Sequence, residues 1–105
     1  MDLEVYWTRF AENKLDDIFN YYETTSNKII AKRLVNGIID KTIGIEKSPY
    51  IGQKELLLEN YKQEFRYLVH KNYKIIYWIN SSKKRIEISN VFDTRQNPNK
   101  MNEIV

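Results

Sequence analysis

A chain of 105 residues with only three glycines and two prolines has the length of one domain and offers no flexible linker. It is 42% hydrophobic and 13% aromatic, which is typical of a folded protein rather than a disordered one. It has no cysteine and one histidine, which excludes disulfides and thiolate metal sites and leaves few ligands for any metal ion. The first residues are acidic where a secretory leader is basic, and no apolar run approaches the roughly 20 residues that span a bilayer. We therefore expect a cytoplasmic protein that uses no cofactor.

The net charge of +3 is unevenly distributed along the chain. Residues 1–61 hold 8 basic and 10 acidic side chains, for a net charge of −2, whereas residues 62–105 hold 9 and 4, for a net charge of +5. A basic half of this kind suits an acidic partner, such as a nucleic acid or an acidic protein segment. An unevenly charged, solvated surface explains the pattern equally well, so charge alone does not identify a partner.

The first half of the chain predicts a strand followed by two helices. Apolar residues alternate over residues 3–7, which indicates a strand. Thr8 is a suitable cap for a helix, and apolar residues at helical spacing predict that helix over 9–23. A short polar break leads to a second apolar stripe, whose helix should end near Lys47 because Pro49 disfavours helical geometry in the residue before it. Two helices with so short a connection should pack as an antiparallel hairpin.

The second half predicts mainly strands. Residues 49–53 indicate a loop, and residues 54–58 are expected to form a short strand. The segments 64–70 and 73–79 are rich in aromatic and β-branched residues, and we expect them to be strands joined by the two-residue loop Lys71-Asn72.

A last strand is predicted over 85–92, and the polar segment that follows it should lie on the surface. We expect a single domain over residues 1–98 and a C-terminal tail over 99–105. The order of elements predicts an α+β domain: an N-terminal strand, an antiparallel helix hairpin, and a mainly antiparallel sheet of three or four strands with the helices on one face.

Five segments resemble toxins of the RelE/ParE superfamily, in the same order and with similar spacing. They are Val5-Tyr6-Trp7-Thr8 with the helix that follows, Pro49 with Gly52, Phe65-Arg66-Tyr67-Leu68-Val69, Tyr73-Lys74-Ile75-Ile76-Tyr77, and Val91 to Pro98. The resemblance covers roughly residues 3–98. It implies the toxin of a bacterial type II toxin–antitoxin system, of the kind associated with plasmid stabilisation, which inhibits growth until a cognate antitoxin neutralises it.

The expected hairpin assigns side chains to the two faces of the sheet. With Lys71-Asn72 as its loop, Arg66 lies opposite Tyr77, Leu68 opposite Ile75, and His70 opposite Tyr73. These residues should face the helices. The other, open face should carry Phe65, Tyr67, Val69, Lys74, Ile76 and Trp78.

The resemblance leaves the mechanism open. ParE-like toxins block DNA gyrase, whereas RelE-like toxins cut messenger RNA on the ribosome with basic residues on the open face. Phe65 and Tyr67 stand where such a ribonuclease would have lysines, and only Lys74 and Arg95 match its basic positions. A ParE-like inhibitor of gyrase is therefore slightly favoured. A RelE-like ribonuclease with Lys74, Arg95 and His70 as catalytic residues, or a non-toxic relative that only binds its antitoxin, stays as the alternative.

Several residues are candidates for contact with a partner. Tyr67, Ile76 and Trp78 should form an exposed apolar stripe, and such stripes mark partner surfaces. Together with Lys74 and Arg95, they form our expected binding site for the antitoxin or the target. The alternative is that the tail from Arg95 onward folds over this face.

Two further residues have a structural and a functional interpretation. Arg66, on the helix side, should form an ion pair with a helix carboxylate such as Asp16 or Glu23 rather than bind phosphate. His70 is expected to be a partly exposed histidine beside the hairpin loop, although histidine is also the usual acid or base at neutral pH.

Overall fold

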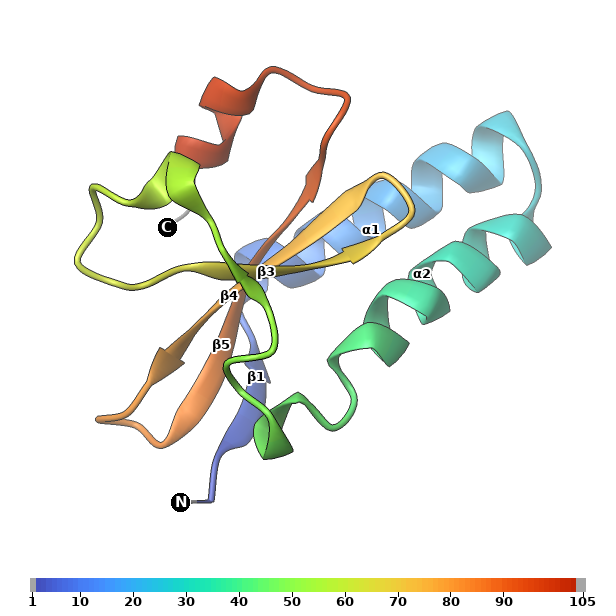
Figure 1. The fold of residues 1–105 in the computed structure, drawn as a ribbon. Coiled ribbons are helices and arrows are strands. Elements are labelled where there is room, and N and C mark those ends of the chain that lie inside the picture. Colours follow the sequence, from blue (N-terminus) through green and yellow to red (C-terminus); the bar gives the residue numbers. More distant parts are fainter. Residues whose placement is uncertain (1, 104–105) are drawn as a thin grey trace.

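The computed structural model describes residues 2–103 and has a five-stranded sheet with the strand order β1-β5-β4-β3-β2 (Figure 1). Two helices, α1 (Arg9–Thr25) and α2 (Lys28–Thr42), form a hairpin on one face of the sheet. The strands are β1 (Glu4–Trp7), β2 (Gln53–Lys54), β3 (Arg66–His70), β4 (Tyr73–Asn80) and β5 (Arg85–Asp93). Three 3-10 helices complete the fold: η1 (Ile45–Lys47), η2 (Leu56–Leu58) and η3 (Pro98–Glu103). The predicted α+β fold class is confirmed.

Both helices begin at the caps that the sequence supplies. The Thr8 hydroxyl accepts a hydrogen bond from the backbone N–H of Ala11 and donates one to the carbonyl of Ile88 at 3.0 Å. It therefore starts α1 and ties that start to β5 at the same time. The side chain of Asn27 caps α2 by accepting from the N–H of Ile30 at 2.9 Å.

The central hairpin has the predicted register, with Arg66 opposite Tyr77 and His70 opposite Tyr73. Lys71 adopts a positive φ of 54°, which allows the two-residue loop to close without a glycine. All neighbouring strands are antiparallel except β1, which runs parallel to β5. The four strands of the second half thus form the expected antiparallel sheet, and the N-terminal strand β1 extends it at one edge.

Two element boundaries differ from the sequence-based prediction. The second helix was expected to reach Lys47 but ends at Thr42, because Gly44 takes a left-handed conformation with φ of 85° and only a short 3-10 turn follows. The strand expected over 54–58 was wrong beyond Lys54, where the chain turns into η2.

A hydrophobic core lies on each face of the sheet. The larger core packs α1 and α2 against the strands, and Ile38, Ile75 and Ile88 are fully buried in it. The smaller core, which we call the outer core, lies on the opposite face and consists of Leu58, Phe65, Ile76, Phe92 and Met101. Figure 1 shows η2 and η3 together on the side of the sheet away from the helices.

The outer core corrects two expectations. The stripe on the open face was expected to be exposed, but Ile76 is fully buried, and Tyr67 and Trp78 are half-buried against the outer core. The tail was expected on the surface, but Met101 is only 1% exposed, so the alternative in which the tail folds over this face is confirmed. Apolar strand residues need a cover, and the chain's own η2 and η3 supply it.

Within residues 2–103, no helix combines the length and the hydropathy that a membrane-spanning segment requires. The same residues contain no group of three or more His, Asp or Glu side chains placed to hold a metal ion.

Truncating Met101 should destabilise the protein although it lies near the C-terminus. Because its side chain fills the outer core, Met101→Ala should lower the free energy of unfolding by about 2–5 kcal/mol, the usual cost of such a cavity. Urea denaturation measures the change. Asn99→Ala, which alters an exposed side chain of the same segment, is the matched control and should leave the midpoint almost unchanged.

Candidate functional site

The sheet keeps the three candidate catalytic residues apart. His70 belongs to β3 and faces the helices, whereas Lys74 of β4 lies on the outer face. Arg95 follows the end of β5 and lies beside α1, where its guanidinium reaches the Tyr22 hydroxyl at 3.4 Å. The three side chains therefore do not converge on one reacting group.

Lys74 is held in a closed ion pair. Its Nζ lies 2.8 Å from Oε2 of Glu55, whose side chain is only 3% exposed, and 4.3 Å from the centre of the Tyr67 ring. This pair was not predictable from the sequence, because Glu55 comes from the segment next to η2, 19 residues away in the chain. A charge neutralised in this way has little field left for a phosphate group.

Arg66 is a structural residue, but the expected helix carboxylate is not its partner. Its guanidinium donates to the carbonyl of Gly52 at 2.8 Å, approaches Glu64 at 3.5 Å, and stacks over the Tyr50 ring. The loop 49–52 packs against this end of the hairpin and offers its carbonyl oxygens. The prediction of Asp16 or Glu23 as partner was therefore wrong.

His70 packs tightly against α2. A Cβ added to Gly37 would lie 2.4 Å from the imidazole Nε2, so a larger residue there would displace the His70 ring. Burial lowers the pKa of His70, and the neighbouring Lys71 and Lys41 lower it further, while Asp40 opposes them. The imidazole is consequently neutral at pH 7 and serves as a packing group of the helix–sheet interface.

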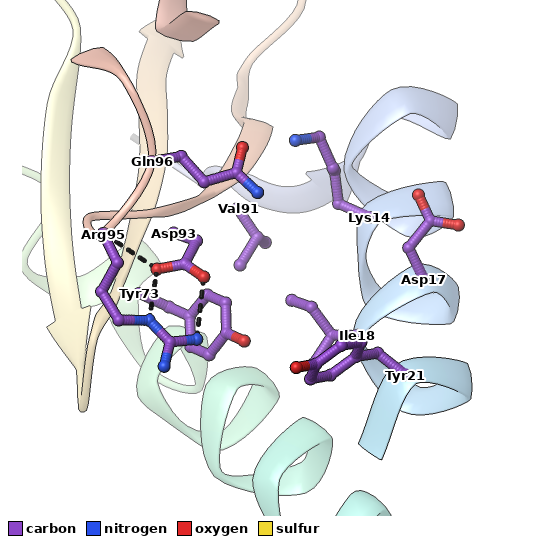
Figure 2. A pocket seen from close by; sticks show the side chains of 9 residues that line it. All are labelled: Lys14, Asp17, Ile18, Tyr21, Tyr73, Val91, Asp93, Arg95 and Gln96. Atoms are coloured by element: carbon purple, nitrogen blue, oxygen red, sulfur yellow. Dashed lines mark hydrogen bonds and ion pairs between the residues drawn. The ribbon is translucent and has the colours of Figure 1, made fainter. Parts of the chain in front are cut away.

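A cleft opens between α1 and the segment that follows β5 (Figure 2). Its volume is about 380 Å³. Its lining comes from distant parts of the chain: Lys14, Asp17, Ile18, Tyr21, Tyr73, Val91, Asp93, Arg95 and Gln96. Of these, sequence reasoning had singled out only Arg95. Tyr21 and Tyr22 stand within the predicted first helix, where adjacent aromatic residues indicate helix packing rather than a cleft.

A polar network fixes one wall of the cleft. The Asp93 carboxylate accepts from Nε of Arg95 at 3.1 Å, from its Nη2 at 2.9 Å, and from the Asn72 amide at 3.1 Å. These bonds, foremost those from Arg95, lower the pKa of Asp93, so it stays ionised. Burial, followed by the contact with Tyr22, raises the pKa of Tyr73 well above its ordinary value, so its hydroxyl stays neutral. Arg95 is thus held in one orientation at the wall of the cleft.

The comparisons with known proteins give one family match and one match of fold. The model of the family described as "ParE toxin of type II toxin-antitoxin system, parDE" matches residues 5–98, which is most of the chain. A solved chain from the "Chromosomal ParDE TA system from P. aeruginosa" has a similar fold, with a TM-score of 0.73 over 88% of this chain and 96% of that chain. At 18% identity, this second match is a likeness of fold. No curated protein sequence matches the chain.

Removing Glu55 should be much more disruptive than removing an exposed carboxylate. Glu55→Ala leaves Lys74 without its buried partner, and we expect a loss of about 3 kcal/mol in the free energy of unfolding. Glu59→Ala removes an exposed carboxylate of the same segment that forms no ion pair among residues 2–103, so it is the matched control, with little expected effect. Equal midpoints for the two variants in chemical denaturation would contradict the closed pair.

His70 should make stability depend on pH. Its pKa is lower in the folded protein than in the unfolded chain, so the unfolded chain takes up a proton first as the pH falls. The stabilisation is therefore complete above the ordinary value of 6.5 and declines below it, down to the folded-state pKa. Thermal melts of His70→Gln should lack this part of the pH dependence. An identical slope in wild type and variant would contradict it.

Proposed function

This chain belongs to the family of ParE toxins of type II toxin–antitoxin systems, and we propose that it acts as the toxin of such a pair by inhibiting DNA gyrase. A cognate antitoxin is its neutralising partner. Inhibition takes place by binding, without a covalent step.

The choice between binding and cleavage rests on one observation: the three candidate catalytic residues lie apart from one another in the fold. Cleavage of RNA needs a base for the 2′-hydroxyl and a positive charge for the phosphorane within hydrogen-bond reach of the same phosphate. Here Lys74 is neutralised by Glu55 on the outer face, and His70 is packed against Gly37 on the helix face. Arg95 lies on the α1 side, beyond the end of β5. This arrangement supports a binding protein rather than a ribonuclease.

The cover of the outer face supports the same choice. A ribonuclease of this superfamily would hold RNA on that face, but η2 and η3 occupy it and bury Ile76 and Met101. The exposed surface includes Tyr21, Tyr50 and Arg95, which are of the residue types that protein interfaces favour. The target is therefore proposed to be a protein.

The purified toxin should block the supercoiling of relaxed plasmid by gyrase and ATP, and it should leave messenger RNA intact in a ribosome-dependent translation assay. Preincubation with the antitoxin is the control and should restore supercoiling. Cut messenger RNA with unaffected gyrase would replace this proposal with the ribonuclease mechanism. Activity in neither assay would indicate a non-toxic, antitoxin-binding relative.

A further inference from the structure

The cleft between α1 and the segment after β5 has an apolar floor. Ile18, Tyr73 and Val91 line it, and each is buried to at least nine-tenths. Tyr21 stands at the edge and is 59% exposed (Figure 2). A concave site of this size accommodates one large apolar side chain with part of its backbone. Exposed tyrosines beside such a floor are typical anchors of protein interfaces.

Arg95 supplies a directed donor at the rim of this cleft. Asp93 occupies its Nε and Nη2, while its Nη1 has no hydrogen-bond partner among residues 2–103. The side chain is 61% exposed, so this free edge is accessible. A guanidinium fixed on one edge loses little conformational entropy when its other edge binds a carboxylate. Lys14 adds a second positive charge to the rim.

The other charged group on the rim is Asp17, and Figure 2 shows its carboxylate directed away from Arg95. It opposes an acidic ligand weakly, from a distance. A second cleft, near η2, has no guanidinium in its lining, and its three glutamates, Glu55, Glu59 and Glu64, outnumber its two lysines. The free guanidinium edge and the apolar floor therefore occur together in the cleft beside α1.

We propose that this cleft anchors the cognate antitoxin, which inserts an apolar side chain between Ile18 and Tyr73 and places a neighbouring carboxylate on the free edge of Arg95. This assignment rests on the part of the proposed function that gives the chain an antitoxin, and it does not depend on gyrase. The antitoxin is the occupant because family membership supplies that partner. The outer face, where the sequence had suggested this contact, is filled by the chain's own tail.

The affinity of the full-length toxin for the purified antitoxin tests the site. Arg95→Ala should weaken binding roughly tenfold or more, the usual effect of losing a charge-assisted hydrogen bond. Arg95→Lys keeps the charge but not the planar fork, so it should recover only part of the affinity. Tyr21→Ala should also weaken binding, and Asp17→Asn should tighten it by up to about fivefold because an opposing charge is removed.

Two exposed residues away from the cleft provide matched controls. Lys83→Ala in the β4–β5 turn corresponds to Arg95→Ala, and Leu56→Ala on η2 corresponds to Tyr21→Ala. Both should bind the antitoxin within about twofold of wild type. Thermal melts establish that each variant is folded before its affinity is compared.

The chemistry of the ligand is tested from the antitoxin side. Each acidic residue of its toxin-binding segment is changed to the corresponding amide and measured against wild-type toxin and against Arg95→Ala. One amide change should weaken binding to wild type and have no further effect on Arg95→Ala, since both remove the same contact. Strict additivity for every acidic residue would overturn the assignment of Arg95.

The outcomes separate this proposal from the gyrase mechanism. Normal antitoxin affinity in both Arg95→Ala and Tyr21→Ala would overturn the site, whatever happens to gyrase. Normal antitoxin affinity with lost inhibition of gyrase would assign the cleft to the target instead. Weakened antitoxin binding in a chain that never inhibits gyrase would leave the site standing while the proposed function fails.

Discussion

The buried hydroxyl of Tyr77 is the interaction on which the layout of the second half of the chain depends. It donates to the carbonyl of Pro49 at 2.8 Å and accepts from the N–H of Gly52 at 2.9 Å, in a residue with no exposed surface. A buried hydroxyl without partners would be costly, so both bonds hold the loop 49–52 against the sheet. Gly52 is required there, because a Cβ would lie 2.6 Å from the Tyr77 hydroxyl. This contact holds the chain at the point where it leaves the helix face and continues into β2 at the edge of the sheet.

The cover of the outer face begins at that edge. After the loop, β2 pairs with β3, and η2 then lies over the outer face with Leu58 in the outer core. Glu55 then reaches Lys74, and Met101 of η3 closes the core from the other end of the chain. From its sequence alone, this face resembles an open surface for nucleic acid. In the folded protein it is covered by the chain's own η2 and η3. The proposed antitoxin cleft accordingly lies at the margin of the sheet, beside α1.

The sequence predicts what is local and fails where distant segments meet. The alternation of side chains along the strands and the two-residue loop were enough to predict the register of the hairpin. The helical spacing of apolar residues after Thr8 was enough to predict α1. The cover of the outer face was not predictable in the same way, since Met101 is a single apolar residue in a polar tail and has no periodicity. The partners of Arg66 and the cleft around Arg95 were not predicted from the sequence, for the same reason. Carbonyl groups of a loop and a tyrosine 73 residues away leave no pattern in the sequence.

Lys74 and Arg95 are the two residues that match the basic positions expected of a ribonuclease. Their counter-ions hold them differently, and this difference limits what each side chain can bind. Lys74 is paired with a carboxylate that water hardly reaches, so freeing it would leave a buried charge uncompensated. Arg95 is paired with Asp93 at the surface, where the pairing orients the guanidinium at little energetic cost and leaves Nη1 unoccupied. The net charge of +5 in the second half of the chain is therefore no measure of an anion-binding groove. The position of each counter-ion makes Lys74 part of the fold and leaves Arg95 accessible to a partner.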